Sequence, residues 1–79
     1  IMSDDLIDHL KNYMSNIIGI DKAMIRKESN FFELGGDSLK ALKLKFNIKD
    51  FLGIDIKISN IYDNFTLDNI VNLIRGEIV

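Results

Sequence analysis

The chain has 79 residues, a formal net charge of −2, one histidine and no cysteine. This composition excludes disulfides and argues against a zinc site, because thiolate ligands are absent and one imidazole cannot hold the metal. Its ten basic and twelve acidic residues are spread along the chain, which argues against nucleic-acid binding. No apolar stretch approaches the roughly 20 residues that span a bilayer, and the acidic start is unlike a signal peptide. We therefore expect one cytoplasmic domain with an apolar core.

The first helix is predicted over residues 3–18. Ser3 is a favourable N-cap, and Gly19 is a favourable stop. Between them, apolar residues recur at helical spacing: Leu6, Ile7, Leu10, Tyr13, Met14, Ile17 and Ile18. Residues 19–37 then form a long loop, which we expect to pack against the core through Ile20, Met24, Ile25, Phe31, Phe32 and Leu34.

The second helix is predicted over residues 38–52, with Gly53 directly after it. One apolar stripe, which is enough to dock a helix on a core, consists of Ala41, Leu44, Ile48 and Leu52. A second stripe, on a different face, consists of Leu39, Leu42 and Phe46. Lysines occupy much of the remaining surface, and their ordinary role there is a solvated face: Lys40, Lys43, Lys45 and Lys49.

The remaining elements are an extended connector and two helices. Ile54, Ile56 and Ile58 alternate with polar residues as in a strand, but the sequence offers no partner strand. Ser59 is the expected cap of a short helix over 59–64, and Thr66 is the expected cap of a last helix over 66–77. The last helix has an apolar face of Leu67, Ile70, Val71, Ile74 and Ile78. The prediction is an all-α fold, a small four-helix bundle with three main helices and one short third helix.

The turn before the second helix, Gly35-Gly36-Asp37-Ser38, has the clearest chemistry. Its two glycines free the backbone to turn and remove side chains that would block an approaching enzyme. Asp37 is a candidate cap. Ser38 then lies at the first helical position, with its hydroxyl exposed beside unpaired N–H groups that favour a phosphate. By itself, the turn would favour an ordinary helix cap over a phosphate site.

The segment Phe31-Phe32-Glu33-Leu34-Gly35-Gly36-Asp37-Ser38-Leu39 resembles the attachment motif of peptidyl carrier domains from nonribosomal peptide synthetases. The resemblance covers nearly the whole chain without gaps. Other matching segments are Ile18-Gly19-Ile20 before the motif and Ile61-Tyr62-Asp63-Asn64-Phe65-Thr66-Leu67 after it. Lys57 and Phe65 depart from it, because prolines are common at both positions, and this leaves the exact position of the third helix open. The resemblance implies a single carrier domain over residues 1–79, with a bundle of the acyl-carrier type and no catalytic or metal-binding residues of its own.

The resemblance also implies that Ser38 receives 4′-phosphopantetheine from coenzyme A, through a phosphopantetheinyl transferase and Mg²⁺. Asp37 resembles the acid that helps to place this metal, and Gly35 and Gly36 belong to the attachment turn. The thiol of the arm would carry an aminoacyl or peptidyl thioester between adenylation, condensation and epimerisation or thioesterase domains. The second glycine, Gly36, favours this branch over a polyketide carrier, and the basic second helix favours it over a fatty-acid carrier. An acyl carrier of a polyketide or hybrid system stays the alternative. We expect a monomer that binds neither nucleic acid nor membranes.

The second apolar stripe is explained by the same resemblance. Leu39 and Leu42 are expected to dock partner domains, together with exposed residues of the short helix, Ile61 and Tyr62. Phe46 lies on the same stripe but is expected to pack into the core.

Two rival functions come from the same residues. Gly36-Asp37-Ser38-Leu39 is also the signature of a hydrolase family with a nucleophilic serine, but that chemistry needs a histidine to activate the serine. The only histidine, His9, precedes Ser38 and is expected to be solvated. The chain is also too short for an α/β hydrolase fold. A helical interaction module without covalent chemistry, or a carrier that is never modified, stays an alternative.

Overall fold

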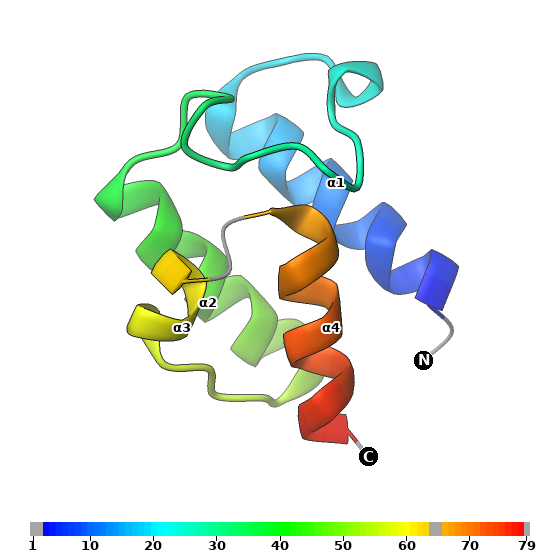
Figure 1. Cartoon of the computed structure of the whole chain (residues 1–79), viewed down its shortest axis with the longest axis vertical. Coiled ribbons are helices and arrows are strands. Elements are labelled where there is room, and N and C mark those ends of the chain that lie inside the picture. The colour runs from blue at the N-terminus through cyan, green and yellow to red at the C-terminus, as the bar shows by residue number, and fades with distance from the viewer. Residues whose placement is uncertain (1–2, 64–65, 79) are drawn as a thin grey trace.

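The computed structural model describes residues 3–63 and 66–78, with side chains described for 5–63 and 66–76. In chain order, its elements are α1 (Ser3–Ile18), the 3₁₀ turn η1 (Lys22–Met24), α2 (Ser38–Leu52), α3 (Ile58–Asp63) and α4 (Leu67–Ile78). The described part of the chain therefore contains three long helices and one short helix, and the all-α prediction is confirmed (Figure 1). None of the described helices combines the length and the apolar composition that crossing a membrane requires.

The long loop crosses one end of the bundle, where it passes over the start of α4 (Figure 1). It leads into α2, so the start of α2 lies at this end as well. The end of α4 lies at the opposite end of the molecule, and the beginning of α1 lies on the side away from the start of α2 (Figure 1). The turn with Ser38 is thus remote from the points where the chain enters and leaves the described bundle.

The core is built from the apolar faces that the helical spacing predicts. In α2, Ala41, Leu44 and Ile48 are buried, and Leu52 is packed against them from the edge. The other helices contribute Leu6, Leu10 and Met14 from α1, Ile61 from α3, and Leu67, Ile70, Val71 and Ile74 from α4. The side chains of Ser3 and Ile78, an expected cap and an expected core residue, lie outside the described residues.

The loop between α1 and α2 packs down on this core, as predicted from its apolar residues. Ile25 and Phe31 are buried, and Ile20, Phe32 and Leu34 are partly buried against the core. The expectation for Met24 was wrong, because its side chain is 66% exposed. Met24 ends the short turn η1, and the next residue, Ile25, enters the core from the extended backbone that follows.

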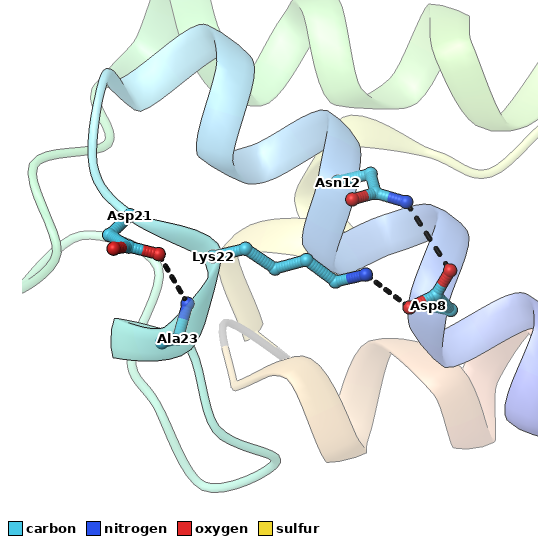
Figure 2. Close-up of polar contacts among 5 residues, drawn as sticks. All are labelled: Asp8, Asn12, Asp21, Lys22 and Ala23. Carbon is cyan, nitrogen blue, oxygen red and sulfur yellow. Dashed lines mark hydrogen bonds and ion pairs between the residues drawn. The ribbon is translucent and has the colours of Figure 1, made fainter.

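Exposed polar contacts hold the first half of this loop to α1 (Figure 2). The ammonium group of Lys22 reaches from η1 to the carboxylate of Asp8, and the Asn12 side-chain amide donates to the same carboxylate at 3.3 Å. Asp21 caps η1, because its Oδ1 accepts from the Ala23 N–H at 3.0 Å. The hydrogen bond from Lys22 is the main cause that lowers the pKa of Asp8 below its ordinary value.

The middle of the loop caps the start of α4. The Leu67 N–H donates to the Ser29 carbonyl at 3.2 Å, and the Asp68 N–H donates to the Lys27 carbonyl at 2.8 Å. Thr66 is the predicted cap, and its hydroxyl oxygen accepts from the Asn69 N–H at 3.3 Å. These bonds satisfy N–H groups that the first turn of a helix leaves without intrahelical partners. They also fix the loop against α4 just before the attachment turn.

The segment between α2 and α4 differs slightly from the prediction. Residues 54–57 belong to neither a helix nor a strand, so the predicted connector without strand pairing is confirmed. α3 begins at Ile58, so Ser59 lies inside the helix and does not cap it. Asn64, the expected end of this helix, and Phe65 lie outside the described residues.

His9 is not simply solvated, in contrast to the expectation from the sequence. Its Nε2 atom lies 2.9 Å from Oδ1 of Asn47, and its ring stacks on Phe51 with centroids 3.6 Å apart. The Tyr13 hydroxyl donates to the Lys43 carbonyl at 3.0 Å along the same pair of helices. These contacts join α1 to α2 outside the apolar core.

Candidate functional site

The segment that precedes α2 is a helical turn organised by Asn30. The Asn30 Oδ1 atom accepts from the N–H groups of Phe32 at 2.9 Å and Glu33 at 3.1 Å. The Asn30 carbonyl accepts from the Leu34 N–H at 3.0 Å. Asparagine side chains commonly start turns in this way. This segment fixes the direction in which the chain approaches Ser38.

Phe31 anchors the turn in the core, and Gly36 packs directly against it. The Phe31 side chain is fully buried, and its carbonyl accepts from the Gly36 N–H at 3.0 Å. A Cβ atom on Gly36 would lie 2.4 Å from Cε2 of Phe31 and 2.7 Å from its carbonyl oxygen. Gly36 is therefore required by the close approach of Phe31, a reason that the sequence alone did not reveal.

Gly35 is required for a different reason. Its φ angle is +114°, which L side chains rarely adopt, and an added Cβ would lie 3.2 Å from Cγ2 of Ile18. Its N–H donates to the Phe32 carbonyl at 3.2 Å. The backbone reverses here and brings Asp37 to the start of α2, so the predicted role of Gly35 in a sharp turn is confirmed.

Asp37 caps α2, as predicted. Its Oδ1 atom accepts from the Lys40 N–H at 2.8 Å, and its carbonyl accepts from the Ala41 N–H at 2.8 Å. The Lys40 N–H, followed by the charge of the Lys40 ammonium group, lowers the pKa of the Asp37 carboxyl below its ordinary value. Ser38 is the first residue of α2 and is exposed. Its side chain therefore lies at the helix N-terminus, where N–H groups and the helix dipole favour an anion.

Lys40 is a member of the site that the sequence analysis assigned to an ordinary solvated face. Its ammonium group donates to the Gly35 carbonyl at 3.2 Å and lies 3.6 Å from Oδ2 of Asp37. Lys40 therefore touches the residues on both sides of Gly36. Its place two residues after Ser38, at the third position of a helix capped by Asp37, is the only sequence signal for this contact.

An aromatic stack joins the attachment turn to α3. The ring of Phe32 meets that of Phe31 edge-on at 5.5 Å and stacks on that of Tyr62 at 5.5 Å with an interplanar angle of 4°. Offset and edge-on arrangements are those that aromatic pairs prefer. Phe32 thus connects the turn to the short helix whose position the sequence left open.

The outward face of α2 carries the second apolar stripe. Leu39 is 61% exposed, and Leu42 and Tyr62 of α3 are also exposed. Two expectations for this surface were wrong. Ile61 is fully buried, because the six-residue α3 turns this side chain into the core. Phe46 is 53% exposed, because it lies on the side of α2 opposite Ala41, Leu44 and Ile48.

The described residues contain no group of three or more histidine, cysteine, aspartate or glutamate side chains that could hold a metal ion. The groups gathered at the turn are an exposed hydroxyl, a capping carboxylate and a lysine ammonium. All three groups lie at the exposed N-terminus of α2.

A family model described as a phosphopantetheine attachment site matches residues 8–74 of the chain. The match begins in α1, ends in α4 and includes the whole attachment turn. It covers well over half of the chain.

The curated relatives include large synthetases. The chain is 36% identical over 67 residues to a beauvericin nonribosomal cyclodepsipeptide synthetase of Gibberella fujikuroi, covering 85% of the chain and 2% of that protein. It is 34% identical over 71 residues to a nonribosomal peptide synthetase of Aspergillus fumigatus, covering 90% of the chain and 3% of that protein. A hybrid PKS-NRPS synthetase of Dothistroma septosporum is 40% identical over 47 residues, with 60% of the chain and 1% of that protein covered. The chain thus spans only a few per cent of the length of these relatives.

Solved structures show the same fold. A free-standing peptidyl carrier protein of Acinetobacter baumannii superposes with a TM-score of 0.85 and 15% identity, over 92% of this chain and 91% of that one. An HMG-ACPI domain from the CurA module of Lyngbya majuscula also gives a TM-score of 0.85, with 20% identity over 95% of this chain and 76% of that one. The predicted acyl-carrier type of bundle is therefore confirmed.

Proposed function

The chain belongs to the family of phosphopantetheine attachment domains, and from this membership we propose that Ser38 is the residue that receives the arm. The chain is a carrier domain of a non-catalytic family, and its cofactor is covalently attached 4′-phosphopantetheine. The observation that carries the proposal is the exposure of Ser38 at the first position of α2, directly after a turn held by Phe31 and Gly36.

The residues around Ser38 fit a phosphodiester. The helix N-terminus favours the added negative charge, and the preceding residues Gly35 and Gly36 carry no side chains. Asp37 contributes a carboxylate of lowered pKa, so it is ionised at neutral pH and able to help place Mg²⁺ during attachment. Once attached, the arm supplies a terminal thiol that holds an acyl group as a thioester. The chain itself contributes the tether, which raises the effective concentration of that group at a neighbouring catalytic site.

The proposed setting is a nonribosomal peptide synthetase, in which the arm carries aminoacyl or peptidyl groups. The relatives with this activity in their names and the Gly35-Gly36 pair support this branch. The partners would be a phosphopantetheinyl transferase, followed by adenylation, condensation and epimerisation or thioesterase domains. The hybrid relative keeps an acyl carrier of a mixed polyketide and peptide system as the second candidate. We propose that the domain acts in the cytoplasm as a monomer.

The exposed apolar side chains on α2 and α3 are the proposed docking surface. We define it as Leu39, Leu42, Phe46 and Tyr62, all of which are exposed. Phe46 joins this surface because it is not used by the core. Exposed large apolar side chains grouped next to a functional group are typical of surfaces that bind proteins. The stripe begins directly after Ser38, so a partner that binds here would meet the base of the arm.

The experiment that tests the attachment site is a loading assay. The chain is incubated with coenzyme A, Mg²⁺ and a broad-specificity phosphopantetheinyl transferase, and its intact mass is measured. We expect the parent to gain one phosphopantetheinyl group and the Ser38→Ala variant to gain none. Ser59→Ala, which removes an exposed hydroxyl from α3, is the matched control and should load like the parent. Normal loading of a folded Ser38→Ala variant would refute the proposed site.

The docking surface is tested by measuring the initial rate of the same loading reaction at several concentrations of each carrier variant. Leu39→Ala and Phe46→Ala should raise the KM of the transferase for the carrier while the thermal unfolding midpoint stays close to that of the parent. Met24→Ala is the control, because Met24 is equally exposed but lies on η1. Equal KM values for all three variants would argue against this surface as the one that the transferase binds.

A further inference from the structure

Lys40 is the one cation in the part of the sequence that surrounds Ser38. It is the only basic residue from Glu28 to Leu42, a stretch with three acidic residues, Glu28, Glu33 and Asp37. Attachment of a phosphodiester to Ser38 adds a further negative charge to this stretch. Within this stretch, only the positive charge of Lys40 is able to offset the negative charge of the phosphodiester.

The contacts of Lys40 keep its ammonium group at the attachment turn. The group donates to the Gly35 carbonyl at 3.2 Å and lies 3.6 Å from Oδ2 of Asp37, the neighbour of Ser38 in the chain. The next lysines on α2 differ in their surroundings. Lys43 is exposed, and the ammonium group of Lys45 contacts Asp55 instead. The Lys40 side chain thus folds back over the start of α2, whereas that of Lys45 reaches the connector after α2.

We propose that Lys40 is a positioning residue of the attachment site, whose ammonium group holds Gly35 and Asp37 in the unmodified chain and binds the phosphodiester once Ser38 carries the arm. This inference rests on the proposed function of Ser38. In this proposal, the Lys40 ammonium group binds the phosphodiester at the base of the arm. The direction in which the arm leaves α2 then depends on Lys40.

Physical chemistry favours this exchange of partners. A lysine ammonium group has three donors on a flexible stem, and the Lys40 side chain remains 30% exposed, so it is able to turn toward a new anion without unpacking the core. Hydrogen bonds between charged partners are stronger than those to a neutral carbonyl such as that of Gly35. The new charge next to Asp37 would otherwise repel its carboxylate. Lys40 would offset this repulsion, because its ammonium group already lies 3.6 Å from Oδ2 of Asp37, the residue next to Ser38.

The exchange predicts a coupling between the charge of Lys40 and the loading of Ser38. Loading should leave the thermal midpoint of the parent nearly unchanged, because Lys40 offsets the added charge. Loading should lower the midpoint of Lys40→Met, in which Asp37 and the phosphodiester repel each other without compensation. The difference in midpoint change between the parent and Lys40→Met should shrink as the NaCl concentration is raised. The reason is that salt screens the repulsion between the Asp37 carboxylate and the phosphodiester at the surface. Lys40→Arg keeps the charge and should restore the behaviour of the parent.

The direct test is the ³¹P NMR spectrum of the loaded protein, recorded for the parent, Lys40→Met, Lys40→Arg and Lys43→Met. Lys43→Met is the matched control, since it removes the same charge from an exposed position one turn further along α2. We expect the phosphodiester resonance to shift in Lys40→Met alone. In the same variant, loading should lower the thermal unfolding midpoint. The intact mass of each sample reports the loading of Ser38 separately.

The outcomes separate the two proposals. If the parent loads normally but the ³¹P resonance and the midpoint change on loading are the same in the parent and in Lys40→Met, the role of Lys40 is wrong and Ser38 remains the site. The role of Lys40 would also be wrong if Lys40→Met and Lys43→Met changed the ³¹P resonance and the midpoint equally. Such a result would show that net charge, and not the position of Lys40, is responsible. If the folded parent does not load at all, both proposals fall, since Lys40 then has no phosphodiester to bind.

Discussion

The two halves of the loop between α1 and α2 are held in different ways. Residues 19–29 place one side chain, Ile25, fully in the core, and Met24 is 66% exposed. Their side-chain contact with α1 in Figure 2 is the exposed ion pair of Lys22 with Asp8. Residues 30–37 are anchored by the buried ring of Phe31 and by backbone bonds that Asn30 and Gly36 make within the turn. The half that leads to Ser38 therefore has the larger buried side chain and its own hydrogen bonds within the turn, which suits the proposed attachment point.

Removal of Phe31 should have the largest effect on this contrast. Phe31→Ala deletes a fully buried ring, and such changes cost about 3–5 kcal/mol of unfolding free energy. A chain of this size has only a small margin of stability, since about 5–15 kcal/mol is usual for folded domains. We expect the urea midpoint to fall sharply and the loading rate to fall with it.

Met24→Ala is the control in the first half of the loop. Its side chain is mostly in solvent, so the urea midpoint should stay close to that of the parent. If Met24→Ala lowered the urea midpoint as much as Phe31→Ala, the contrast between the two halves of the loop would be wrong.

A methyl group on Gly36 should have the next largest effect. Its Cβ would lie 2.4 Å from the Phe31 ring and 2.7 Å from the Phe31 carbonyl oxygen, and overpacking of this kind costs about 1–3 kcal/mol. Gly76→Ala is the matched control, because Gly76 lies within α4 with nothing within 4 Å of an added Cβ. Since alanine is the better helix former, that variant should be as stable as the parent or more so. If Gly36→Ala unfolds at the same urea concentration as Gly76→Ala, the close packing is wrong.

The sequence was sufficient for most of the fold because three helices have regular apolar spacing. It failed where the spacing does not decide which side is buried. α3 has six residues, too few to define a face, so Ile61 was expected at the surface and is buried. Phe46 belongs to a second stripe on a helix with two apolar faces, and only packing shows which face meets the core.

Contacts between distant residues were also beyond the sequence. The Phe51 ring that covers His9 and the Asn47 amide that bonds to it come from another helix. The Ser29 carbonyl that helps to cap α4 is a backbone group, so the residue types in the sequence do not predict this contact. At the site, the Gly35-Gly36-Asp37-Ser38 pattern was informative because the cap and the turn are local. The contacts of the Lys40 side chain were missed because a lysine on a helix usually points to solvent.

The charge of Asp37 should contribute a smaller, pH-dependent effect. Its pKa in the folded chain lies below the ordinary value of 3.8, mainly because of the Lys40 N–H. The stabilisation is therefore present above about pH 4 and is lost as the pH falls through the lowered value. Asp37→Asn keeps a capping side chain and removes the charge, so its thermal midpoint should fall below that of the parent at pH 6. The two midpoints should converge as the pH falls below the lowered pKa of Asp37. A constant difference at all pH values would contradict this cause.

Changes in the first half of the loop should have the smallest effect on the site. Asp8→Asn removes the carboxylate that Lys22 contacts (Figure 2), and exposed ion pairs of this kind contribute little to stability. We expect amide chemical shifts to change around η1, with the urea midpoint and the loading rate close to those of the parent. A fall in the loading rate as large as that expected for Phe31→Ala would show that the two halves are not independent.

The most direct test of the central claim is to locate the arm in the loaded protein. The parent is loaded with coenzyme A, Mg²⁺ and the transferase, digested, and fragmented in the mass spectrometer until the modified residue is identified. We expect the phosphopantetheinyl group on Ser38 and on no other serine. An arm on Ser29 or Ser59, or an unmodified Ser38 in a protein that has gained the mass, would contradict the account.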